Sequence, residues 1–383
     1  MPRAQAKPKI KKSASQPLRA GAPKLLVEPE DGISALLHGI DGAKRSVDIL
    51  IFRFDHREVE QALLRAARRG VRVRALIAYT NRGGEKNLRA LEMRLLGAGI
   101  IVARSADNLA RYHGKMLIVD ERKLFVLAFN FTYLDIEHSR SFGVILEDRK
   151  LVREAMKLFE SDVLRQPYTP GSAALLISPL NARAELAAFL EGAKKELLIY
   201  DPNVSDSAML RILTEKSKAG VEIKILGGAA KLPVRKLAQI RLHARVILRD
   251  GRDIFIGSQS LRTLELDGRR EVGVIFRDPR GANRVAKTFQ SDWELAAEPQ
   301  ASEPDGELVR TKKIAKRVAK ELTKEMPPVA EVLDLVVKEV AGDSLEVPLN
   351  PEQLQDTVTD ALKRAVKEAV RDAVHEAVEH KAE

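Results

Sequence analysis

Apolar residues along the chain fall into short runs whose spacing changes from one stretch to the next. Continuous or alternating apolar runs predict strands, and apolar residues three and four positions apart predict helices that pack on those strands. In the first part of the chain, strands are expected at 47–52, 71–77, 100–103, 116–119 and 124–129. Helices are expected at 33–40 with its continuation 43–46, at 59–69 and at 87–96. Strands that alternate with helices indicate an α/β fold with mixed, mostly parallel sheets flanked by helices.

The same order of elements returns further along the chain. Helices are predicted at 184–193, 207–219 and 231–239, and strands at 196–200, 221–226, 246–248 and 254–256. The segment YHGKMLIVD at 112–120 matches LHARVILRD at 242–250, and RSFGV at 140–144 matches REVGV at 270–274, each at an offset of 130 residues. A constant offset indicates an internal duplication. We therefore predict two similar α/β halves.

Changes in composition mark the ends of the duplicated part. Residues 1–24 carry seven Lys or Arg and no acidic residue, which predicts a disordered basic arm. The first half is expected at 25–170 and the second half at 171–297. Residues 298–383 are expected to form a linker and a helical tail, in which Ala-Val pairs recur and favour packing or self-association.

Charge narrows the choice of partners. The net charge is +11, and residues 25–297 carry +10 of it because the basic arm and the acidic tail nearly cancel. A positive core attracts the phosphates of lipid headgroups or nucleic acid. The chain has no cysteine, which excludes disulfides and thiolate metal sites and favours a reducing compartment. It also has no apolar run of about 18 residues. We expect a cytoplasmic protein that can contact the inner face of an anionic membrane.

The strongest chemical signal is a histidine, a cation two residues later and an aspartate five residues after that, present once in each half. The residues are His113, Lys115 and Asp120 in the first half, and His243, Arg245 and Asp250 in the second. On a strand, a histidine and a cation two residues apart project to the same face. That pair suits an anionic phosphodiester. The two aspartates have odd spacing from the histidines and precede turns, so we expect them to bind turn amides.

This pattern resembles the H-x-K-x4-D motif of the phospholipase D superfamily, and the resemblance covers about 25–297. It implies a fold of two phospholipase D-like halves and a two-step phosphoryl transfer that needs no metal or other cofactor. One histidine would attack phosphorus and form a covalent phosphohistidine. The other would protonate the leaving oxygen and then activate the acceptor. Family members include phospholipases, cardiolipin and phosphatidylserine synthases, and nucleases.

The family motif usually continues with Gly-Ser-x-Asn and then an acidic residue, and the two halves of this chain keep different parts of that pattern. The first half keeps the asparagine but has Ser141 at the acidic position. The second half keeps the Gly-Ser pair and the acidic residue but lacks the asparagine. The resemblance implies His113, His243 and Glu271 as catalytic residues, Lys115, Asn130, Arg245 and Ser260 as phosphate-binding residues, and Asp120, Asp250 and Ser258 as structural support.

The resemblance also implies that the acidic residue of one half supports the histidine of the other. Glu271 would then support His113, while Ser141 would support His243 only weakly. A carboxylate behind an imidazole sets its tautomer and stabilises its positive charge. We therefore expect His113 to be the nucleophile and His243 the general acid and base.

Three classes of function are compatible with these residues. The first is a phosphodiesterase or phosphatidyltransferase acting on phospholipid. The second is a nuclease, which the positive core favours, although an aromatic content of 4% offers few surfaces for base stacking. The third is a catalytically degenerate protein that binds DNA or anionic lipid, which Arg245 and Ser141 favour because they depart from the family pattern. No metal and no cofactor is expected.

Overall fold

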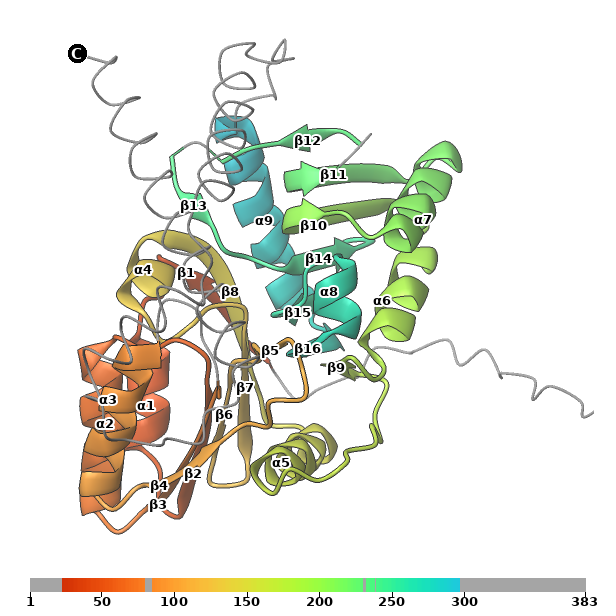
Figure 1. The fold of residues 1–383 in the computed structure, drawn as a ribbon. Coiled ribbons are helices and arrows are strands. Elements are labelled where there is room, and N and C mark those ends of the chain that lie inside the picture. Colours follow the sequence, from red (N-terminus) through yellow and green to blue (C-terminus); the bar gives the residue numbers. More distant parts are fainter. Residues whose placement is uncertain (1–22, 80–84, 230–231, 238, 297–383) are drawn as a thin grey trace, which may run out of the picture. The chain divides into compact units, whose positions relative to one another are not determined.

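The computed structural model describes residues 23–79, 85–229, 232–237 and 239–296 (Figure 1). The strands of the first half are β1 (Lys24–Glu28), β2 (Ser46–Ile51), β3 (Arg72–Ile77), β4 (Ile101–Arg104), β5 (Arg111–Tyr112), β6 (Met116–Val119), β7 (Lys123–Leu127) and β8 (Ser139–Leu146). Its helices are α1 (Ser34–Asp41), α2 (Arg57–Arg68), α3 (Glu85–Gly97), α4 (Tyr133–Glu137) and α5 (Arg149–Val163).

The second half repeats most of this order. Its strands are β9 (Leu175–Ser178), β10 (Glu196–Val204), β11 (Glu222–Ala229), β12 (Val234–Arg235), β13 (Arg241–Leu242), β14 (Val246–Arg249), β15 (Asp253–Gly257) and β16 (Arg269–Arg277). Its helices are α6 (Ala182–Glu191), α7 (Ser207–Lys218), α8 (Thr263–Asp267) and α9 (Pro279–Leu295). The expected duplication is therefore present as two similar sets of strands and helices, which differ at α3: the described residues of the second half contain no helix between β11 and β12.

Each half builds one mixed sheet. The strand order is β1-β8-β7-β6-β2-β3-β4 in the first and β12-β11-β10-β14-β15-β16 in the second, where β9 also pairs with β16. The sheets are mixed, as expected, but they are not mostly parallel. Within each half, the described strands form four antiparallel and two parallel pairings. Short turns between successive strands such as β6 and β7 add antiparallel neighbours, because only a longer crossover can return a strand in parallel.

Local sequence explains the helices that cover these sheets. Helix α2 buries Val59, Ala62, Leu63 and Ala66, which recur at the spacing of one helical face. Helix α9 begins after Asp278, whose carboxylate accepts the amides of Arg280 and Gly281, and it has a proline in its first turn. In Figure 1, α1, α2 and α3 lie together on one face of the sheet that contains β2, β3 and β4.

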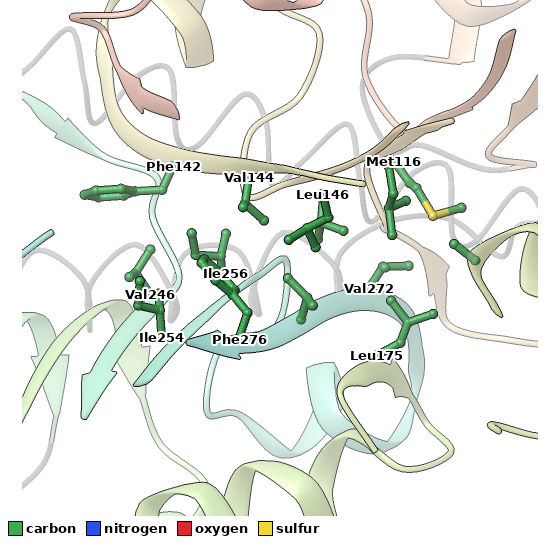
Figure 2. Packing of buried hydrophobic residues seen from close by; sticks show 14 of the residues in the cluster. Met116, Phe142, Val144, Leu146, Leu175, Val246, Ile254, Ile256, Val272 and Phe276 are labelled. Carbon is green, nitrogen blue, oxygen red and sulfur yellow. The ribbon is translucent and has the colours of Figure 1, made fainter. Parts of the chain in front are cut away.

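An apolar core is shared between the two sheets. Figure 2 shows side chains of β6 and β8 facing side chains of β9, β14, β15 and β16. The labelled residues of the first half are Met116, Phe142, Val144 and Leu146, and those of the second are Leu175, Val246, Ile254, Ile256, Val272 and Phe276; all are buried in one cluster. Because apolar burial is the main stabilising term in folding, this cluster joins the two halves into one unit.

Two short strands pass from one half to the other. β5 pairs in parallel with β16, and β13 pairs in parallel with β8. The amide of His113, directly after β5, donates to the Arg270 carbonyl at 2.7 Å. The amide of His243, directly after β13, donates to the Arg140 carbonyl at 3.0 Å. Each half therefore holds the main chain of the other half's histidine.

Three predicted features need correction or fall outside the described residues. The helix at 33–40 is present as α1, but it ends at Asp41 and does not continue over 43–46. The prediction of a helix over 231–239 is wrong for the described residues of this range, which include β12. Pro233 disfavours a helix, and the edge of β11 offers main-chain groups with which β12 pairs. Residues 1–22 of the arm and 297–383 of the tail lie outside the described residues. In the described part of the chain, no helix is long and apolar enough to cross a membrane.

Candidate active site

The sequence pattern suggested that His113 and His243 lie on strands, but in the structure they do not. Each begins a three-residue connection between a two-residue strand and the next strand, β6 or β14. The strands at the two ends of each connection pair with sheets of different halves. The motif cations Lys115 and Arg245 end these connections and are buried. Both motifs are thus placed at the junction of the two halves.

Two ion pairs, one buried and one partly buried, support the same main-chain positions. Arg140 Nε donates to Asp292 Oδ2 at 2.7 Å, and Arg270 Nη2 donates to Asp162 Oδ1 at 3.1 Å. Each pair joins a residue that holds a histidine amide to a helix of the opposite half, α9 or α5. Because breaking a buried pair leaves an uncompensated charge, these pairs tie the two halves together at the site.

His113 is enclosed by groups of both halves. Its Nδ1 lies 2.8 Å from Glu271 Oε2, a carboxylate of the second half. The Lys115 ammonium lies 2.8 Å from Nε2 and donates to the His113 carbonyl at 2.7 Å. Phe52 packs edge-on against the imidazole, with 4.5 Å between ring centroids. The expected contact between His113 and Glu271 is therefore present across the two halves.

Burial sets the protonation states of His113, Lys115 and Glu271. Burial, followed by the nearby charges of Lys115 and Arg245, holds the pKa of His113 well below its usual range. Burial lowers the pKa of Lys115 to about 7, and burial raises the pKa of Glu271 to about 7 against the pull of Lys115. The imidazole is therefore neutral at neutral pH, and the lone pair of its Nε2 faces the ammonium of Lys115.

The second histidine has a different set of neighbours. Burial and then Arg245 hold the pKa of His243 well below its usual range, against the nearby carboxylate of Asp135. Arg245 Nε donates to Ser260 Oγ at 3.3 Å, and its buried Nη1 has no hydrogen-bond partner. Ser141 donates to the His243 carbonyl at 2.8 Å, so it supports the main chain of this residue and not its ring.

The sequence reasoning missed two acidic residues, Asp135 and Glu265. Asp135 Oδ2 accepts from the Asn130 amide at 2.9 Å and from Asn130 Nδ2 at 2.6 Å. Glu265 Oε2 accepts from the Ser260 amide at 2.8 Å. Asp135 also lies 3.4 Å from His243 Nδ1, measured from Oδ2. Asp135 and Glu265 lie 130 residues apart, which is the offset of the duplication, and this spacing is a sequence signal that could have identified them.

A serine and a glutamate exchange places between the two halves. Because β1 pairs with β8, Glu28 lies opposite Ser141, and because β9 pairs with β16, Ser178 lies opposite Glu271. Glu28 is fully buried, and neither of its carboxyl oxygens has a hydrogen-bond partner. Burial, and then the charge of Asp31, raise the pKa of Glu28 to about 8. The first half therefore does carry a buried carboxyl group opposite Ser141, but it lies on β1 and not on β8.

The residues expected as structural support contact main-chain groups. Asp120 accepts the amides of Lys44, Arg45 and Ser46 at 2.6 to 3.0 Å. Asp250 accepts the amides of three consecutive residues, 194–196, at 2.7 to 3.2 Å. Ser258 Oγ accepts the Val272 amide at 3.1 Å, on the strand that carries Glu271.

We predict that Asp120→Ala lowers the free energy of unfolding by about 2–3 kcal/mol with little change in kcat, because several charge-assisted hydrogen bonds to amides are lost. Denaturant unfolding compared with Asp250→Ala, which removes the matching contacts in the second half, measures the effect. A loss of kcat without a loss of stability would instead place Asp120 in the chemistry.

Taken together, the arrangement holds two neutral imidazoles, the buried basic side chains of Lys115 and Arg245, and acidic side chains that reach across the halves. The cations can bind a phosphoryl group, one imidazole can attack it, and the other can move a proton. Asn130 Oδ1 and Arg245 Nη1 are buried without partners, so each can still bind a ligand.

Comparison with known proteins supports this picture of the fold. A family model described as "Cardiolipin synthase, PLD-like domain" matches residues 36–163 and 186–293. Mouse mitochondrial cardiolipin hydrolase is 29% identical over 141 residues, which are 37% of this chain and 62% of that protein. A polyphosphate kinase of Vibrio parahaemolyticus is 26% identical over 274 residues, which are 63% of this chain and 39% of that protein. The chain spans less than two thirds of the length of these curated relatives.

Solved structures share the fold. Phosphatidylserine synthase of Haemophilus influenzae superposes with a TM-score of 0.61 at 12% identity, over 82% of this chain and 97% of that one. Polyphosphate kinase of Porphyromonas gingivalis superposes with a TM-score of 0.60 at 18% identity, over 71% of this chain and 50% of that one. Because the family model matches both halves and more than half of the chain, this protein belongs to the family of cardiolipin synthase, phospholipase D-like domains.

Proposed function

We propose that this protein is a phosphodiesterase or phosphatidyltransferase that acts on phospholipid through a covalent phosphohistidine. The observation that carries the proposal is the contact of His113 Nδ1 with the buried Glu271 carboxylate of the other half, beside the ammonium of Lys115. Because Glu271 occupies Nδ1, Nε2 is the ring nitrogen left to attack, and it becomes free when the ammonium of Lys115 turns from it to the phosphoryl oxygens.

In the first step, His113 Nε2 attacks phosphorus and the bond from phosphorus to the leaving oxygen breaks. His243 donates its proton to that oxygen. The pKa of His243 is low in the free protein, and an anionic phosphodiester beside the ring raises it and favours the protonated form. Glu271 stabilises the positive charge that develops on His113 as the phosphorus–nitrogen bond forms.

In the second step, the neutral His243 removes a proton from water or from an acceptor alcohol. The oxygen attacks phosphorus, the phosphorus–nitrogen bond breaks, and His113 is released as the neutral imidazole. Water gives hydrolysis and an alcohol gives transfer of the phosphatidyl group. In both steps Lys115 and Arg245 bind the phosphoryl oxygens, and Asn130 and Ser260 supply further polar contacts.

Phospholipid is the preferred substrate class because several relatives carry phospholipid enzyme names, such as mitochondrial cardiolipin hydrolase and the phospholipase D of Rickettsia felis. The positive charge of residues 25–297 also suits nucleic acid, so a nuclease of the same superfamily is the second candidate. A binding protein without turnover is the third, since Arg245 differs in shape from the lysine of the family motif.

The proposal is tested by incubating the protein with labelled phosphatidylglycerol, cardiolipin and single-stranded DNA. Release or transfer of the labelled phosphatidyl group supports the proposal. Cleavage of DNA alone would support the nuclease, and binding without any product would support the degenerate binding protein.

We predict that turnover survives EDTA. The charge that forms on the phosphoryl oxygens is compensated by Lys115 and Arg245, so the proposed steps use no metal ion. Product formation is measured before and after dialysis against chelator, with added Mg²⁺ or Zn²⁺ as the comparison. Loss of turnover that a divalent ion restores would contradict the proposed mechanism.

A further inference from the structure

We propose that Asp135 is the positioning residue of His243: it orients the imidazole and stabilises its protonated form from the opposite half of the molecule. The inference rests on the proposed function, in which His243 gives and takes the proton. It adds a carboxylate to the expectation that Ser141 supports His243 only weakly.

The geometry places a carboxylate at the inner nitrogen of the ring. Asp135 Oδ2 lies 3.4 Å from His243 Nδ1, and this nitrogen is buried without a hydrogen-bond partner. A small rotation of the His243 ring would shorten this separation to that of an ordinary hydrogen bond. A proton on Nδ1 would then leave Nε2 as the nitrogen that exchanges a proton with the substrate.

Asp135 is held in place by contacts that keep it ionised. It is 2% exposed, its Oδ2 accepts from the amide and the side chain of Asn130, and its Oδ1 accepts from Arg241 Nη1 at 2.6 Å. Burial alone would raise the pKa of this carboxyl, but His243, the Asn130 amide and Arg241 together hold it below its usual range. A carboxylate fixed by three donors loses little further freedom when it binds an imidazole.

The charged groups around His243 come from several elements. Arg245 and Arg241 lie on the same segment, Lys115 comes from the first-half motif, and Asp135 comes from α4. Among these neighbours, the three basic groups lower the pKa of His243 and Asp135 raises it. Removal of the Asp135 charge would therefore leave the ring surrounded by cations.

The second half shows why this role falls to Asp135. Its counterpart Glu265 accepts the Ser260 amide and pairs with Arg269, at 3.1 Å from Oε1 to Nη1. His113 Nδ1, however, lies against Glu271. The first half has Ser141 in place of that glutamate, and its hydroxyl is bonded to the His243 carbonyl. Each histidine thus has one carboxylate of the opposite half at its Nδ1, supplied from different positions of the duplicated sequence.

The test compares Asp135→Asn with Glu265→Gln, which alters the matching turn in the second half without touching His243. Two phosphodiesters are used, one with an alkoxide leaving group that needs a proton and one with a nitrophenolate that needs none. We expect D135N to lower kcat for the first substrate by about tenfold or more, because loss of a nearby opposite charge shifts a pKa by at least about one unit. The nitrophenyl ester should lose much less in its first step, and E265Q should leave the ratio between the two substrates unchanged.

A second measurement does not depend on turnover. NMR titration of the histidine ring protons, assigned with His243→Gln, should show a lower pKa of His243 in D135N than in the wild type or in E265Q. Should D135N fail to fold, Asp135→Glu, which keeps the charge but moves it by one methylene, is expected to give a smaller shift in the same direction. An unchanged His243 titration, or an equal loss for both substrates in D135N and E265Q, would overturn the inference. A wild type with no turnover but with the expected titration shift would instead count against the proposed function alone.

Discussion

Replacement of His113 by alanine is expected to abolish formation of the covalent adduct and to lower turnover by about 10⁴-fold or more, as loss of a nucleophile does in enzymes with covalent intermediates. Neighbouring side chains cannot take over the attack, because Lys115 and Glu271, which contact the imidazole, are arranged to bind or stabilise charge. The measurement is acid-quenched trapping of the labelled adduct, followed by identification of the modified peptide.

His243→Asn is the matched variant for this experiment. It should still form the adduct from a substrate with a good leaving group, since such a group needs no proton, and should then stall before the acceptor attacks. Glu271→Gln should slow adduct formation more than Ser141→Ala does, because only Glu271 contacts a ring nitrogen. A label on His243 would reverse the assignment of the two histidines, and the absence of label from the wild type would favour the degenerate binding protein.

Glu28→Gln is expected to change how the stability of the protein depends on pH. The folded-state pKa of Glu28 is about 8, against 4.5 for the ordinary carboxyl. The folded state therefore retains a proton that the unfolded state releases, and wild-type stability falls as pH rises from about 4.5 to 8. A shift of this size corresponds to at most about 5 kcal/mol at pH 8 and above. Glutamine does not ionise, so the variant lacks this loss.

The measurement is the free energy of unfolding in denaturant at pH 5 and at pH 8. The advantage of Glu28→Gln over wild type should be several kcal/mol larger at pH 8 than at pH 5. Ser178→Ala, at the matching position of the second half, removes no ionisable group and should shift both values alike. If the free energy of unfolding changed with pH equally in wild type and in Glu28→Gln, Glu28 would be ionised in the folded protein at both pH values.

Much of the fold and the two histidine motifs of the candidate site follow from the sequence alone. Local apolar patterns predicted β2, α2 and β3 to within about two residues, because α2 buries one helical face and β2 is a continuous run of buried residues. The 130-residue offset between the motifs predicted the duplication, and the spacing of His113, Lys115 and Asp120 indicated phosphodiester chemistry. Each of these signals lies within one short segment or is repeated in another, so it can be identified without knowing which segments meet.

The tertiary structure decided which groups meet. The pairing of β5 with β16 and of β13 with β8 carries each histidine to the opposite half, and strands of two residues leave no periodic signal. The approach of Asp135 to His243 and the exchange of Glu28 for Ser141 depend on strand register between segments about one hundred residues apart in the chain. Burial then sets the pKa values of Lys115 and Glu271 near 7, far from those of the free side chains. Such shifts come from desolvation and from charges brought together by folding, which no local sequence pattern specifies.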